Sequence, residues 1–292
     1  MNVHWVDIII SWWSFLMSRG YVIQADTDPE LYQAELLANS IKIKNKDAQV
    51  CLVTSRNLEA DAFNDIVKYE FYMHEEVANI RQKDWQLYWC SPYEYTIAMD
   101  CKSIVMESHD NLWDYLIDNH SVCLPTVVKD FRNNVLVDKQ LSKYEQEYKY
   151  KKAYGNCFYF DKSEESLQYF KFLDPLCRDW RSAEGSLFQK QHANKEYYSD
   201  LIHTVAANSM RFDVFPISND ILSYIDMNIA WSDGILPDGE NWLDVMSVWS
   251  TDIATLKIQN YSINNTLYYH EDSFYNNEIA DDFRNYREAI NK

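Results

Sequence analysis

Short hydrophobic runs alternate along the chain with longer stretches in which hydrophobic residues recur every three or four positions. Runs typical of buried strands lie at residues 21–25, 50–54, 96–99 (continuing near 104–106), 122–128 and 156–161. Helical spacing predicts helices at residues 29–41, 112–117, 163–180 and 200–210. Strands that alternate with helices predict an α/β fold with a mostly parallel central sheet and flanking helices.

Two of the predicted helices carry recognisable start signals. Asp28 is followed by Pro29, which suits an N-cap and the first helical position. Ser163 is a similar N-cap before Glu164, a negative charge that the helix dipole favours. We expect Pro175 to end or kink this second helix, because proline removes a backbone hydrogen bond.

The pattern is weaker in several other stretches. Residues 57–69 predict a helix or irregular chain, with a third strand near 69–73, and the charged stretch 138–152 a solvated helix or a mobile loop. Residues 234–239 are turn-rich, and an extended segment ends at 268–270. We expect one domain over residues 18–275, a C-terminal tail or helix at 276–292, and an apolar extension at 1–17.

The extension contains the stretch WVDIIISWWSFLM at residues 5–17, which includes Asp7. This stretch is shorter than the roughly 20 apolar residues of a spanning helix, so we expect no transmembrane span. Three interpretations stay open: a helix packed on the fold, a Trp-rich interfacial anchor, or translated sequence upstream of a start at Met17.

Composition limits the kinds of ligand. Asp and Glu number 45 against 27 Lys and Arg, a net charge of −18, which argues against a protein that coats nucleic acid. Only 5 of the 292 residues are glycine, and neither G-x-G-x-x-G nor a Walker A motif occurs. The six cysteines form no C-x-x-C pair and predict reduced thiols, so we expect a cytoplasmic protein, in the host cytoplasm if the source is viral.

Ligands of open α/β sheets bind beyond the carboxyl ends of the strands. The residues at those positions are Asp26 and Asp28, Ser55 and Arg56, and Asp100 to Lys102. A nucleotide site in this chain must therefore be built from side chains at strand ends.

Four segments, taken in order, resemble the GT-A fold of nucleotide-diphospho-sugar glycosyltransferases, in particular family-eight-like enzymes and their phage-type relatives. They are residues 21–55, 91–116 (SPYEYTIAMDCKSIVMESHDNLWDYL), 153–173 (AYGNCFYFDKSEESLQYFKFL) and 264–274 (NNTLYYHEDSF). The resemblance spans residues 18–275. It implies transfer of a sugar from a nucleotide-diphosphate donor to an acceptor hydroxyl on a glycan, a protein or a modified DNA base.

The resemblance also implies roles for individual residues. The donor-binding residues would be Ala25, Asp26, Arg56, Asp100, Lys102 and Asn156, with Gly155 beside the sugar. Asp100 and His270 would hold Mn²⁺ or Mg²⁺, which stabilises the leaving diphosphate. Asp200 would act near the acceptor, as a base in an inverting reaction or by positioning the sugar in a retaining one.

The chain departs from the family where its metal-binding D-x-D is expected. Here the sequence is Asp100-Cys101-Lys102, so a lysine replaces the second carboxylate. Three outcomes stay open: a metal-assisted enzyme, a metal-independent enzyme in which Lys102 supplies the positive charge, and a catalytically degenerate module that binds a nucleotide or a protein.

Overall fold

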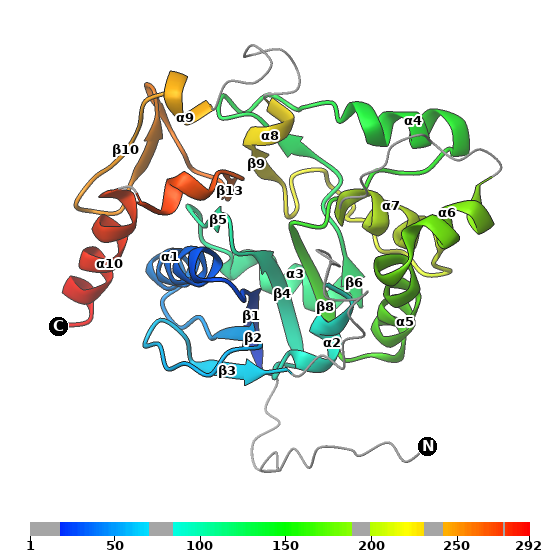
Figure 1. Ribbon diagram of the computed structural model, residues 1–292, viewed down its shortest axis with the longest axis horizontal. Helices are drawn as coiled ribbons and strands as arrows, with labels where there is room; N and C mark the ends of the chain where they lie inside the picture. The colour runs from blue at the N-terminus through cyan, green and yellow to red at the C-terminus, as the bar shows by residue number, and fades with distance from the viewer. Residues whose placement is uncertain (1–17, 70–83, 189–198, 231–241, 277) are drawn as a thin grey trace.

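A six-stranded sheet forms the centre of the protein, for which the computed structural model describes residues 18–69, 84–188, 199–230, 242–276 and 278–292 (Figure 1). Its strand order is β3-β2-β1-β4-β8-β6. The strands are β1 (Arg19–Gln24), β2 (Val50–Thr54), β3 (Asp65–Lys68), β4 (Tyr95–Asp100), β6 (Val122–Cys123) and β8 (Cys157–Asp161). β3, β2, β1 and β4 are parallel, whereas β8 runs antiparallel to its neighbours β4 and β6. The predicted α/β fold with a mostly parallel sheet is confirmed.

The register of the parallel strands determines where the site can form. Gln24 at the end of β1 pairs with Val53 of β2 and with Asp100 of β4. The carboxyl ends of these three strands therefore lie along one edge of the sheet. The chain leaves that edge into α1 after β1 and into a tight turn after β4.

Helices cover the sheet and extend around it. They are α1 (Asp28–Lys44), α2 (Leu87–Cys90), α3 (Asp110–Asn119), α4 (Lys139–Tyr148), α5 (Glu164–Arg178), α6 (Trp180–Leu187), α7 (Ser199–Ser209), α8 (Met227–Ala230), α9 (Trp242–Val245) and α10 (Glu278–Ile290), with 3-10 turns η1 (Asp84–Gln86) and η3 (Asp272–Asn276). α5 contacts α6 and α7 on one side of the molecule, and α10 lies against α1 on the other (Figure 1). None of the helices in the described ranges is long and apolar enough to cross a membrane.

Two smaller sheets complete the fold. One has the order β5-β13-β9-β7, formed by β5 (Ser103–Ile104), β13 (Leu267–Tyr268), β9 (Tyr224–Asp226) and β7 (Val128–Lys129). The other joins β10 (Val248–Ser250), β11 (Leu256–Ile258) and β12 (Tyr261–Ser262). The first of these sheets brings the late strand β13 next to β5, which follows β4 directly in the chain.

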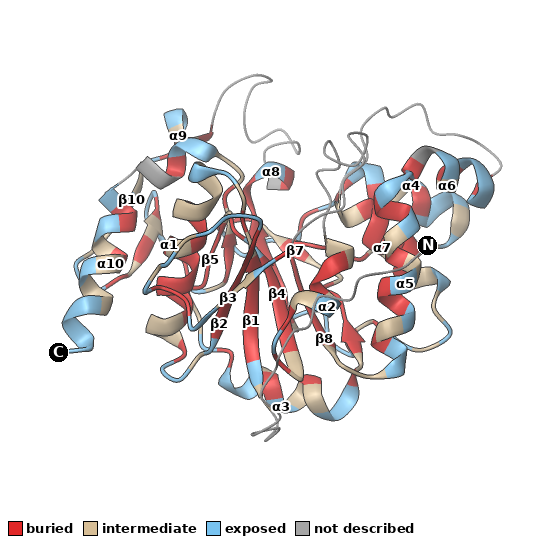
Figure 2. Ribbon diagram, turned by 60° about the horizontal axis from the view of Figure 1, so that its bottom comes forward, coloured by how far each residue is buried: buried red, intermediate tan, exposed pale blue. Residues whose placement is uncertain are grey.

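The core has two parts. The larger surrounds the central sheet, whose inner strands are buried almost throughout (Figure 2). The smaller lies between α1, β11 and α10 and includes Leu36, Leu256 and Phe283, each nearly or fully buried. Arg287 of α10 also donates a hydrogen bond to Asn39 Oδ1 of α1 at 2.6 Å. The C-terminal helix is thus packed on the strand-and-helix unit that opens the fold.

The structure corrects several predictions of local structure. A single strand at 122–128 is wrong: the chain forms β6 and then β7 in a different sheet, because Pro125 between them has no N–H to donate to a ladder. Residues 57–69 are not all irregular or helical, since they contain β3, an edge strand with no buried position. The third strand thus begins before the predicted 69–73, of which 70–73 lie outside the described residues.

The helix start signals are partly right. α1 is capped by Thr27 rather than Asp28, and a capping box joins Thr27 to Glu30. Ser163 does cap α5, whose helix continues past Pro175 to Arg178 instead of ending there. The charged stretch 138–152 holds α4, capped by Asp138. The apolar extension at 1–17 and the turn-rich 234–239 lie outside the described residues.

Candidate active site

The edge formed by β1 and β2 carries a network of charged side chains. Asp26 accepts a hydrogen bond from the Ser55 backbone at 2.8 Å and another from the Tyr69 hydroxyl. Arg56 forms an ion pair with Asp28 and reaches the Asp26 carbonyl at 3.4 Å. Asp26 therefore joins the ends of two strands, and the neighbouring guanidinium of Arg56 remains partly exposed at the same edge.

The end of β4 carries the predicted Asp100. Its Oδ1 accepts a hydrogen bond from the Lys102 backbone at 2.8 Å, and its Oδ2 lies 3.5 Å from the Tyr268 hydroxyl. The residue keeps solvent contact, yet desolvation by the surrounding protein raises the pKa of its carboxyl, against the opposing effect of the Lys102 N–H. Asp100 thus presents a carboxylate held by the turn that follows it.

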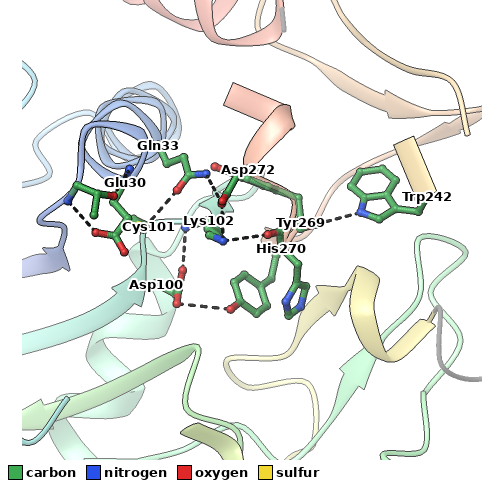
Figure 3. A network of polar contacts seen from close by, with 11 residues as sticks. Glu30, Gln33, Asp100, Cys101, Lys102, Trp242, Tyr269, His270 and Asp272 are labelled. Atoms are coloured by element: carbon green, nitrogen blue, oxygen red, sulfur yellow. Dashed lines mark hydrogen bonds and ion pairs between the residues drawn. The ribbon is translucent and has the colours of Figure 1, made fainter. Parts of the chain in front are cut away.

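Lys102 extends from this turn to the segment after β13. Its ammonium lies 2.6 Å from Asp272 Oδ1 and donates to the His270 carbonyl at 3.1 Å (Figure 3). Burial acts to lower the pKa of Lys102, but the hydrogen bond and the charge of Asp272 outweigh it and raise that pKa. Lys102 accordingly stays a cation at neutral pH.

His270 is held from both its backbone and its ring. Its φ is 64°, in the left-handed region of backbone conformation that residues other than glycine rarely adopt. Its Nε2 lies 3.0 Å from Asp226 Oδ1, and its ring centroid lies 3.8 Å from that of Tyr268. Pairing of Tyr268 with Asp226 between β13 and β9 brings this segment into place. The structure therefore brings His270 and Asp100 into one site on either side of Tyr268.

Asp200, the residue predicted to act near the acceptor, lies at the start of α7. Its Oδ1 accepts a hydrogen bond from the Gly155 backbone at 2.8 Å. Desolvation raises the pKa of the Asp200 carboxyl well above its ordinary range, and the negative charges of Asp226, Asp138 and Asp84 raise it further. A carboxyl with such a pKa is a stronger base when it ionises.

Gly155 and Asn156 connect Asp200 to Asp100. Asn156 is buried, its carbonyl accepts a hydrogen bond from the Asp100 backbone at 2.9 Å, and its side chain lies 3.4 Å from Ser103 Oγ. Two of the predicted donor-binding residues, Asn156 and the fully buried Ala25, thus have supporting positions in the core behind the strand ends.

Three carboxylates and one tyrosine of this region escaped sequence reasoning. Asp226 is nearly fully buried and also accepts the Ile229 backbone N–H at 2.8 Å. Its position directly after a short hydrophobic run was a signal for a strand-end carboxylate. Asp272 and Tyr268 flank the predicted His270, whereas nothing in the sequence connects Asp84 with this region.

Asp84 positions the helix that carries Asp200. Its Oδ2 accepts a hydrogen bond from Ser199 Oγ at 2.8 Å and lies 3.1 Å from Nε2 of the buried His203. The opposite ring nitrogen of His203 lies 2.7 Å from the Tyr169 hydroxyl of α5. These contacts give His203 a structural role between α7, α5 and the Asp84 turn.

The residues present do not form a ready site for Mn²⁺ or Mg²⁺. Such cations take about six oxygen ligands in a regular shell. Asp100 supplies one carboxylate, the second position is the cation Lys102, and the His270 Nε2 is engaged with Asp226. Within the described ranges, no group of three or more His, Cys, Asp or Glu side chains could hold a metal ion. A divalent cation is therefore not matched by the side chains gathered here.

Comparisons with known proteins place the fold. No family model matches the chain, and no curated protein matches it. Among solved structures, the galactosyltransferase LgtC, crystallised with donor and acceptor sugar analogues, is similar with a TM-score of 0.51 at 10% identity. The match covers 92% of this chain and 95% of LgtC. The chain thus shares the α/β fold of LgtC.

Two further structures match less closely. The glycosyltransferase GlyE of Streptococcus pneumoniae TIGR4 has a TM-score of 0.44 at 11% identity, over 87% of this chain and 55% of GlyE. The bifunctional glycosyltransferase WbbM has a TM-score of 0.34 at 14% identity, over 55% of this chain. The matched region spans only 34% of the WbbM chain.

Proposed function

We propose that this protein transfers a sugar from a nucleotide-diphosphate donor to an acceptor hydroxyl. The observation that carries the proposal is the meeting of Asp100, Lys102 and His270 at the carboxyl edge of a sheet with the LgtC fold. Ligands of such sheets bind at this edge. The glycine-poor sequence agrees, because this mode of nucleotide binding needs no glycine-rich loop.

The reaction assigns separate tasks to the two ends of the site. The bond between sugar C1 and the diphosphate oxygen breaks, and its electron pair leaves with the nucleoside diphosphate. Carbon C1 then bonds to the acceptor oxygen. The acceptor proton passes to the Asp200 carboxylate in an inverting reaction, or to the departing phosphate oxygen in a retaining one, where Asp200 positions the sugar.

Arg56 and Lys102 are the positive groups on the donor side, and Asp26 orders the strand ends between them. Fixed positive charge near the leaving oxygens stabilises the charge that develops there. The acceptor is a hydroxyl of a glycan, a protein or a modified DNA base, the last of these for a phage-encoded enzyme.

The test is incubation of the purified protein with a panel of nucleotide sugars, with release of nucleoside diphosphate and the shift in melting temperature as readouts. A glycosyltransferase should release nucleoside diphosphate from at least one donor and also be stabilised by that donor. Asp100→Ala should lower donor turnover on the order of 100-fold, because the carboxylate that orders the β4 turn is lost. Asp114→Ala, on the exposed face of α3, is the matched control.

A protein that is stabilised by a nucleotide but releases no product would instead be a binding module of the same fold. If no donor is hydrolysed and none shifts the melting temperature, the transferase proposal is wrong.

A further inference from the structure

We infer that the donor diphosphate is held without a divalent metal, by the Lys102 ammonium, and that the Asp272 carboxylate occupies the phosphate position until the donor displaces it. This inference rests on the proposed function and specifies how that site recognises its nucleoside diphosphate. Its basis is the disagreement between the residues present and the metal that the fold family implies.

Lys102 is a fixed cation. It occupies the position where the family resemblance expects a second metal-binding carboxylate, two residues after Asp100. Its ammonium is anchored by the His270 carbonyl at 3.1 Å, and its side chain is 27% exposed. The backbone carbonyl of Lys102 accepts the Tyr269 N–H at 3.0 Å, so the turn is tied to the same segment at two points. A positive charge is thus present at the strand end without any metal.

Asp272 is the partner that can leave. It begins η3, its side chain is 67% exposed, and its Oδ1 contacts Lys102 at 2.6 Å and the Gln33 amide at 3.4 Å (Figure 3). A carboxylate and a phosphate oxygen both satisfy an ammonium donor, so one can replace the other. Because partly exposed ion pairs contribute little net stability, exchange of Asp272 for a phosphate costs little.

His270, the other predicted metal ligand, is already engaged through one ring nitrogen. The His270 Nε2 is bonded to Asp226, which is nearly fully buried and also holds the Ile229 N–H. Coordination of a metal through Nε2 would leave the Asp226 carboxylate without this partner in the interior, which is costly. The contacts of His270 therefore favour the ring as a brace for the Lys102 anchor.

The experiment measures binding of UDP, GDP, ADP, CDP and dTDP by calorimetry, each in EDTA and in Mn²⁺. The variants are Lys102→Ala, Lys102→Gln, which keeps much of the aliphatic stem, and Asp272→Asn. Lys129→Ala is the matched control, since Lys129 also pairs with an aspartate, Asp220 at 3.0 Å, outside the site. Melting temperatures establish that each variant is folded.

The inference expects one nucleoside diphosphate to bind equally well in EDTA and in Mn²⁺. Loss of the ammonium should weaken that binding by roughly tenfold or more, the usual effect of removing a charged hydrogen bond. Asp272→Asn should tighten it by about two- to fivefold, the strength of a partly exposed ion pair. Lys129→Ala should bind like the parent protein.

Binding that requires Mn²⁺ would overturn the inference and leave the proposed function standing. Unchanged affinity in both Lys102 variants, or weaker binding by Asp272→Asn, would likewise overturn the inference and leave the proposed function standing. Failure of all five nucleotides to bind in either buffer would instead overturn the proposed function, and this inference with it.

Discussion

His109, at the start of α3, makes the folded protein sensitive to acid. The residue is 4% exposed, and its Nδ1 lies 3.1 Å from the hydroxyl of the equally buried Tyr21. Its backbone N–H donates to Asn45 Oδ1 at 2.6 Å. Burial, opposed only in part by the charge of Asp110, lowers the pKa of His109 from 6.5 to about 4. The folded state thus holds a neutral imidazole over a range in which the unfolded chain binds a proton.

The sign and size of the effect follow from this difference. Between pH 6.5 and pH 4 the unfolded chain takes up more protons at this residue, so stability falls as the pH falls. Each unit of difference in pKa corresponds to about 1.4 kcal/mol. At about pH 4.5 the free energy of unfolding should therefore be about 2.5 kcal/mol lower than at about pH 7.5, from His109 alone.

The comparison is between the parent protein and His109→Gln, whose amide keeps a polar group near Tyr21 but does not titrate. Urea unfolding across this pH range gives the free energy of unfolding of each. We expect the variant to have a lower free energy of unfolding than the parent at neutral pH. The difference in free energy between the two proteins should narrow by about 2.5 kcal/mol at about pH 4.5. The contributions of other titrating groups, such as His120, to the pH dependence are the same in both proteins and cancel in the difference. If the free energies of unfolding of the parent and of His109→Gln fall in parallel with pH, the lowered pKa of His109 is refuted.

Two further changes test the local structure and the site. Thr27→Ala removes the N-cap of α1 and its bond to the Glu30 N–H, and should lower the free energy of urea unfolding by about 1 kcal/mol, whereas an unchanged midpoint would contradict the capping box. Gly155→Ala places a Cβ 2.3 Å from Ser199 Oγ and so displaces the neighbouring Asp200. Sugar transfer should fall by about 100-fold, whereas calorimetry should show that binding of the nucleoside diphosphate is retained. Equal loss of transfer and of binding would contradict the role of Asp200 on the acceptor side.

Much of the fold was predictable because its strands are buried on both faces. The runs at 21–25, 50–54 and 96–99 became β1, β2 and β4, since a strand covered on both sides must be hydrophobic throughout. β3 was misplaced for the opposite reason. It is an edge strand whose end residues, Asp65 and Lys68, are exposed, so its short hydrophobic stretch resembles a loop.

The meeting of charged residues at one edge of the sheet was predictable from the same pattern. Residues that follow parallel strands must meet at one edge, which places Asp26, Arg56 and Asp100 together without any knowledge of packing. Their individual contacts were not predictable. Ser55 and Tyr69 donate hydrogen bonds to Asp26. These contacts depend on how the loops after β2 and β3 are placed at the edge of the sheet, which the sequence pattern does not show.

By itself, the sequence determined the parallel α/β sheet, the strand ends that carry charge, and the replacement of a carboxylate by Lys102. Only the tertiary structure decided the partners of those groups. Asp272 reaches Lys102, and Asp226 reaches His270, through the pairing of β13 with β5 and β9. Strands of two or three residues carry too little hydrophobic pattern to specify such pairings. Contacts between residues more than 40 positions apart are instead selected by the packing of the whole chain.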